Sequence, residues 1–128
     1  MVIYLDSGDP SAMFRWESQV AGFTTNPSLM RQARIANYHS FAGGVLKVVN
    51  GKPVSFEVLC DELDEMEEQA NEIASWASNV YVKIPVTNTK GESCAPLMRK
   101  LGLNGIKINA TAVFTFEQIR TVARSLVH

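Results

Sequence analysis

One lysine, Lys83, stands inside the apolar segment "NVYVKIPV" (79–86), which is otherwise typical of a buried β-strand. Lysine is rarely fully buried unless it has a partner or a chemical role. Burial disfavours the charged form of an amine, so a desolvated lysine can attack a carbonyl near neutral pH and form a Schiff base. That chemistry also needs a carboxylate that transfers protons and hydrogen-bonding groups that hold a hydroxylated substrate.

Side chains of both kinds stand at the ends of the other apolar segments or inside them. The candidate proton carriers are Asp6 and Glu57. Because functional groups gather at the carboxyl ends of parallel strands, we expect one convergent site. The candidate ligands for substrate hydroxyls are Thr25, Asn26, Asn109 and Thr111.

Simpler structural interpretations of several of these residues remain open. Asp6 can accept backbone N–H groups in the turn "DSGDP", and Asn26 can serve only as the N-cap of a helix that begins at Pro27. Glu57 and Lys83 interrupt strands that should be covered on both faces. They can therefore form a buried ion pair with a purely structural role.

Strand-like and helix-like patterns alternate along the chain. Asp9 and Asn26 each precede a proline in the way that N-caps do, and "TFEQ" (115–118) is a capping box before an amphipathic segment. The expected strands, all short and rich in apolar or β-branched residues, are 2–5, 21–24, 54–58, 80–84 and 105–109.

Two further segments predict helices. Over about 61–77, apolar residues at three- and four-residue spacing form one stripe opposite an acidic face, which we interpret as a solvated surface rather than a metal or protein site. Within 41–53 we expect a helix that ends near Asn50, with Gly51 in the turn that follows.

This alternation predicts βα crossovers and a parallel sheet covered by helices, which is an α/β protein with one domain over residues 1–128. Two architectures fit equally well. One is an open, doubly wound sheet of five strands, and the other is a partial (β/α)8 barrel with about five of the eight units.

Composition limits the partners and the compartment. A net charge of −1 gives no general attraction to nucleic acid, and no run of 18 apolar residues predicts a membrane span. Cys60 and Cys94 are too few for a disulfide framework, and they have no metal-ligand spacing with His39 or His128. We therefore expect a cytoplasmic protein with no metal and no cofactor.

Five motifs, in chain order, carry a resemblance to a known family. They are "YLDSGD", "GFTTNPSL", "VSFEVLCDELDEMEEQA", "NVYVKIPVT" and "LGLNGIKINATAVFT". The sequence resembles the transaldolase and fructose-6-phosphate aldolase family over essentially its whole length. The combination of "TTNPS" and "VKIP" in this order is the most specific part of the resemblance.

The resemblance implies a class I aldolase-type TIM barrel and a role for each candidate residue. Lys83 is similar to the Schiff-base lysine, and Asp6 to the acid/base carboxylate of the first strand. Glu57 with Thr111 resembles the pair that orients the catalytic water, and this glutamate favours the transaldolase branch because the aldolase branch tends to carry glutamine. The residues that the resemblance implies as substrate ligands are Asn26, Thr25 and Asn109.

The implied function is transfer of a dihydroxyacetone unit between sugar phosphates, as in the pentose phosphate pathway. The alternatives are an aldolase-type lyase and an inactive partial barrel that acts as an assembly module. The resemblance covers five βα units, without the later strands whose arginine and serine positions hold the substrate phosphate. We expect a truncated chain that self-associates as a homo-oligomer; the other possibilities are an open flavodoxin-like sheet, exchange of elements in an oligomer, or a separate partner chain.

Overall fold

The computed structural model describes residues 1–127, so His128 lies outside the described residues. Its strands are ordered β1-β2-β3-β4-β5 in one parallel sheet, and helices alternate with them along the chain. The strands at the two ends of this order are β1 and β5, so the sheet is open. The α/β prediction is therefore confirmed.

The elements are short, as expected for βα repeats. In chain order they are β1 (Tyr4–Asp6), α1 (Pro10–Trp16), the 3-10 helix η1 (Glu17–Gln19), β2 (Gly22–Thr24), α2 (Pro27–Gln32), α3 (Tyr38–Val48), β3 (Val54–Glu57), α4 (Leu63–Ser75), β4 (Val80–Pro85), α5 (Ala95–Leu103), β5 (Ile108–Thr111) and α6 (Phe116–Leu126). Within residues 1–127 no helix has the length and apolar character that crossing a membrane requires.

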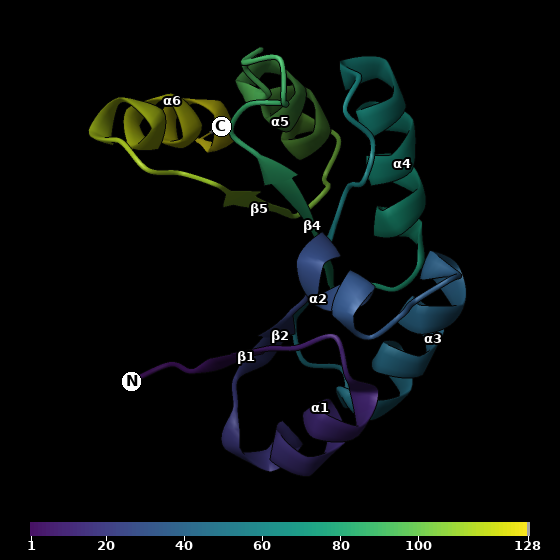
Figure 1. Ribbon diagram of the computed structural model, residues 1–128. Helices are drawn as coiled ribbons and strands as arrows, with labels where there is room; N and C mark the ends of the chain where they lie inside the picture. Colours follow the sequence, from purple (N-terminus) through teal and green to yellow (C-terminus); the bar gives the residue numbers. More distant parts are fainter. Residues whose placement is uncertain (128) are drawn as a thin grey trace. The chain divides into compact units, whose positions relative to one another are not determined.

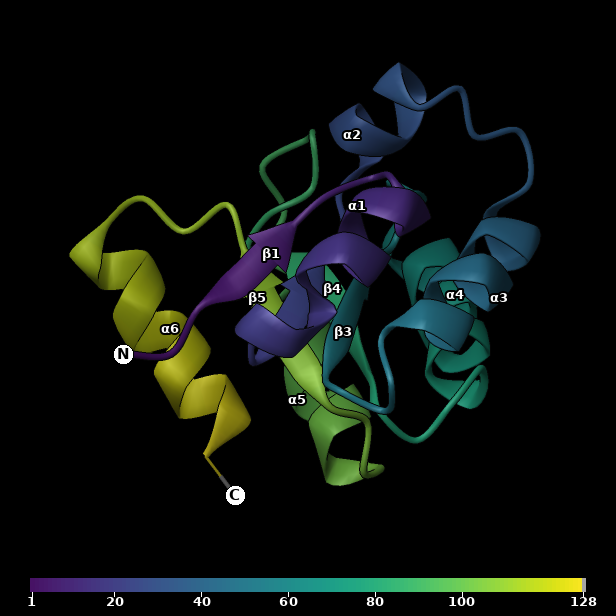
Figure 2. The same cartoon turned by 90° about the horizontal axis from the view of Figure 1, so that it is seen from below.

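The chain divides into two compact units, and the first comprises Met1–Glu57 with Trp76–Val80. Here β1 pairs with β2, and β2 pairs with β3, both in parallel. Figure 2 shows β1 leading through a short turn into α1, which contacts α3. The apolar core of this unit includes Met13, Phe23, Phe41, Val45, Val54 and Phe56.

Both predicted N-caps of the first unit are present. The Asp9 side chain accepts a hydrogen bond from the Ser11 N–H at the start of α1, at 2.9 Å. The Asn26 side chain accepts one from the Leu29 N–H at the start of α2, also at 2.9 Å. These bonds satisfy backbone donors that the first turn of a helix leaves without partners.

The second unit comprises Val58–Ser75 and Tyr81 onward. Its strands β4 and β5 pair in parallel, and α5 contacts α4, α6 and β5 (Figure 1). The predicted stripe on α4 buries Met66, Ala70 and Ile73, and α6 begins with the predicted capping box. Other core residues of this unit are Val82, Ile84, Leu97, Met98 and Leu101.

Three expectations need correction. The fifth strand begins at Ile108 rather than at 105, because Gly105 adopts a φ of +83° in the turn after α5. The first strand begins at Tyr4, and the preceding Val2 is exposed. The expectation that strands are covered on both faces is wrong for β4, in which buried and half-buried residues alternate.

Candidate functional site

Asp6 ends β1, and both oxygens of its carboxylate accept hydrogen bonds from side chains. Thr24, its partner in the parallel register, donates from Oγ1 to Oδ1 at 2.8 Å. Asn26 donates from Nδ2 to Oδ2 at 3.2 Å. The carboxylate is thus held from β2 and from the start of α2, and it does not act as the backbone acceptor of the "DSGDP" turn, where the Ser7 hydroxyl accepts from the Asp9 N–H instead.

Asn26 therefore has two structural roles at once. Its Oδ1 accepts from the Leu29 N–H as the N-cap of α2, and its Nδ2 donates to Asp6. The two bonds use the two ends of one amide, so they fix its orientation. The predicted N-cap is therefore confirmed, and its predicted role as a substrate ligand stays a prediction.

Thr25 is fully buried, and its hydroxyl is directed at β3. Its Oγ1 donates to the carbonyl of Ser55 at 3.0 Å, and its N–H donates to the same oxygen at 3.1 Å. Thr25 thus joins β2 to β3, whereas its neighbours in sequence approach Asp6. Its predicted role as a substrate ligand stays a prediction.

Glu57 is the last residue of β3, and its side chain is half-buried. Its backbone carbonyl accepts a hydrogen bond from the Tyr38 hydroxyl at 2.7 Å. Burial raises the pKa of the Tyr38 phenol well above its ordinary value, and the negative charge of Glu57 raises this pKa further. The phenol is thus close to the Glu57 carboxylate and stays protonated.

Tyr38 is a residue that the sequence analysis missed. It begins α3, and its ring packs edge-on against Phe56 and Trp76 at centroid distances of 6.2 and 5.2 Å. The sequence signal was weak, since only the Asn37 N-cap marks the start of this helix.

In the second unit, Lys83 lies on β4 directly opposite Asn109 on β5. Partner residues of neighbouring parallel strands project to the same face, so these two side chains lie side by side. Thr111 follows two residues later on the same face of β5, paired with Pro85. The backbone carbonyl of Lys83 accepts from the Val58 N–H at 3.1 Å, which ties β4 to the segment after β3.

The face that carries Lys83 is half-buried, whereas its neighbours Val82 and Ile84 are fully buried on the opposite face. The sequence pattern "VYVKIP" therefore separates a core face from a face that carries an amine next to amide and hydroxyl groups. A primary amine in such surroundings can act as a nucleophile.

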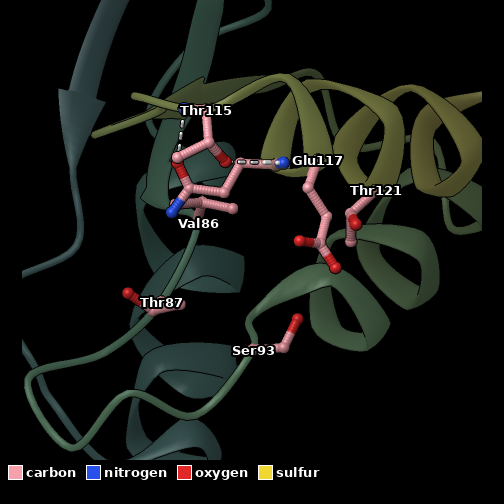
Figure 3. A pocket seen from close by; sticks show the side chains of 7 residues that line it. Val86, Thr87, Ser93, Thr115, Glu117 and Thr121 are labelled. Atoms are coloured by element: carbon pink, nitrogen blue, oxygen red, sulfur yellow. Dashed lines mark hydrogen bonds between the residues drawn. The ribbon is translucent and has the colours of Figure 1, made fainter.

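A cavity of about 250 Å³ lies beyond the carboxyl end of β4, between the segment before α5 and the first turns of α6 (Figure 3). Ser93 lines it, and the Glu117 and Thr121 side chains of α6 project toward it (Figure 3). None of the sequence-predicted site residues lines this cavity. Among residues 1–127 no group of three or more histidine, cysteine or acidic side chains could hold a metal ion.

The fold and the strand-end residues define a class: a protein of parallel βα repeats with a strand lysine, and with carboxylate, amide and hydroxyl groups at the ends of its strands. The model of the transaldolase/fructose-6-phosphate aldolase family matches residues 3–128. The chain belongs to this family.

Relatives described as probable transaldolases match most of the chain. The protein of Streptococcus agalactiae serotype V is 38% identical over 121 residues, which are 92% of this chain and 53% of that protein. The protein of Desulfitobacterium hafniense is 35% identical over 128 residues, or 98% of this chain and 57% of that protein. A Bacillus cereus protein is 40% identical over 106 residues, or 83% of this chain and 46% of that protein. The chain thus spans about half the length of these relatives.

Proposed function

We propose that this chain carries transaldolase chemistry, the transfer of a dihydroxyacetone unit from a ketose phosphate to an aldose phosphate through a Schiff base on Lys83. The observation that carries the proposal is the position of Lys83, half-buried on β4 and in register with Asn109, in a chain of this family. The probable transaldolases among its relatives support the same reaction. We place this reaction in the pentose phosphate pathway of the cytoplasm.

The first step forms the imine. The Nζ of Lys83 attacks the ketone carbon of the substrate, and the resulting carbinolamine loses its hydroxyl group as water. Glu57 and Thr111 orient this water and the water that later hydrolyses the imine. Asn109, next to the lysine, donates to a hydroxyl of the bound substrate.

The second step breaks the carbon–carbon bond. Asp6 accepts the proton of the hydroxyl group on the carbon β to the imine, the bond between the α and β carbons breaks, and its electron pair moves into the enamine. An aldose phosphate leaves as an aldehyde. Attack of the enamine on a second aldose phosphate reverses these steps, with Asp6 returning the proton.

The contacts of Asp6 suit this role. Its carboxylate is held at both oxygens by Thr24 and Asn26, so its orientation is set before a substrate arrives. We also propose that Asn26 and Thr25 contribute to binding of substrate hydroxyls. No metal or cofactor takes part in this mechanism.

A lyase that protonates the enamine and releases dihydroxyacetone is the nearest alternative, and Glu57 favours the transferase because the family's aldolase branch tends to carry glutamine there.

A second candidate function is an assembly module. Phe114 and Phe116, which are 88% and 83% exposed near the start of α6, favour self-association into a homo-oligomer. Light scattering after size-exclusion chromatography tests this, and a mass equal to one chain contradicts it.

Borohydride trapping tests the proposed reaction. The protein is incubated with fructose 6-phosphate and sodium borohydride, and the modified peptide is identified by mass spectrometry. We expect a reduced adduct on Lys83 alone, lost in Lys83→Met and unchanged in Lys47→Met, which removes an exposed lysine of α3. A folded protein that gives no adduct, or adducts spread over several lysines, refutes the proposal.

A further inference from the structure

The ladder between β2 and β3 is made by N–H donors at alternate residues, the first within β2 and the second directly after it. Phe23 donates to the carbonyl of Pro53 at 2.8 Å, and Thr25 donates to the carbonyl of Ser55 at 3.1 Å. In a parallel ladder the next donor is two residues further along the first strand, and the next acceptor is two residues further along the second. These positions are 27 and 57.

Residue 27 is a proline, which has no N–H group to donate. Pro27 is the first residue of α2, where a proline is favourable for the helix. The cost of starting α2 with proline is that β2 has no ladder donor for the carbonyl of Glu57. The Tyr38 hydroxyl donates to that carbonyl instead, at 2.7 Å.

The Tyr38 hydroxyl is held in place from three sides. Its residue begins α3 directly after the Asn37 N-cap, and its ring packs edge-on against Phe56 and Trp76. The Thr25 hydroxyl also interacts with the phenol. A donor fixed in this way restrains the end of β3 more tightly than a mobile surface side chain or water can.

We propose that Tyr38 is a positioning residue for Glu57: its hydroxyl takes the place of the missing ladder donor and fixes the end of β3 that carries the glutamate. The proposal rests on the proposed function, in which Glu57 orients the catalytic water. When the hydrogen bond is lost, the end of β3 gains freedom, and a displacement of about 1 Å in a catalytic group is enough to slow a reaction by up to about 100-fold.

The substitution Tyr38→Phe removes the hydroxyl and keeps the ring. Its matched control is Tyr81→Phe, which makes the same chemical change on β4 and keeps the ring that lies under the Lys107 ammonium. Hydrogen exchange followed by mass spectrometry reports the end of β3 without any need for activity. We expect faster exchange in peptides that span residues 54–58 for Tyr38→Phe only.

The rate of adduct formation on Lys83 then tests whether this position matters for the reaction. We expect about a tenfold decrease for Tyr38→Phe and no change for Tyr81→Phe. In a Glu57→Gln background, Tyr38→Phe should change the rate by less than about twofold, because its effect passes through the glutamate.

The outcomes distinguish this inference from the proposed function. Unchanged exchange near β3 in Tyr38→Phe, or rate losses that multiply in the double variant, overturn the positioning role while Lys83 still forms its adduct. If the protein without substitutions forms no adduct, the proposed function is overturned, and with it the role of Tyr38 in catalysis.

Discussion

Gly8 lets the turn after β1 pass directly against the first turns of α2. A Cβ at this position would lie 2.7 Å from the carbonyl oxygen of Leu29 and 2.9 Å from its carbonyl carbon. Both are backbone atoms, so no side-chain rotation relieves the overlap, and α2 has to shift. Such overpacking costs about 1–3 kcal/mol. The shift also strains the 3.2 Å hydrogen bond from Asn26 to Asp6, a bond of a type that contributes about 1 kcal/mol.

We therefore expect Gly8→Ala to lower the free energy of unfolding by about 1–4 kcal/mol. Gly44→Ala is the matched control, because Gly44 lies inside α3 and a Cβ there would meet nothing within 4 Å apart from its chain neighbours and the backbone of its own helix. Alanine is favoured over glycine in a helix, so this change should raise the free energy of unfolding by up to about 1 kcal/mol. The same added methyl group should thus have opposite effects at the two positions.

Urea unfolding followed by far-UV circular dichroism measures both changes, with the slope of the transition unaltered. The reasoning is refuted if Gly8→Ala is as stable as the unmodified protein, or if the two substitutions change stability in the same direction. Release of the aldose phosphate from fructose 6-phosphate should also slow in Gly8→Ala, because the Asn26 contact that orients Asp6 for this step is displaced.

Two further predictions use matched or single substitutions. Asn37→Ala removes an N-cap and should lower the free energy of unfolding by about 1 kcal/mol, whereas Asn26→Ala removes an N-cap and a hydrogen bond to Asp6 and should lower it by about 2 kcal/mol. Only Asn26→Ala should slow release of the aldose phosphate from fructose 6-phosphate, because it removes a partner of Asp6; equal release rates would contradict this. The pKa of Tyr38 is raised, so above pH 10.0 the folded protein retains a proton that the unfolded chain releases. The stability that the neutral phenol contributes is therefore complete below pH 10.0, the ordinary pKa of tyrosine, and decreases as the pH rises above that value. Between about pH 9 and about pH 11, the urea midpoint should decrease more for the unmodified protein than for Tyr38→Phe. Equal decreases would show that this tyrosine does not titrate as described.

Local features of the fold were readable from the sequence because they depend on residues close together in the chain. The N-caps Asp9 and Asn26 bond to N–H groups two or three residues later, and the capping box formed by Thr115 and Gln118 is equally local. The α4 stripe was also readable, since its spacing follows the helical repeat. The parallel order of the strands followed from the alternation of helix and strand.

Features that depend on residues far apart in the chain could not be predicted from the sequence. The pattern of the fifth strand extends back to 105, and only the conformation of Gly105 shows that the turn after α5 includes it. The role of Tyr38 depends on a ladder position that Pro27 leaves without a donor, which requires the register of β2 and β3. The candidate residues were found by type and by resemblance, whereas the partners that hold Asp6 came from the register of β1 and β2.

The double use of the Asn26 amide restricts which amino acids can occupy position 26. Aspartate is an equally good helix cap, but an ionised carboxylate has no hydrogen to donate and would repel Asp6. Serine and threonine also cap helices, yet their side chains are short and carry one hydroxyl group, which cannot reach the helix N–H and the carboxylate together. A library at this position selected for helix capping alone should accept all four residues, whereas selection for an oriented Asp6 should retain asparagine. One codon therefore encodes both the start of α2 and the geometry of a carboxylate 20 positions away in the sequence.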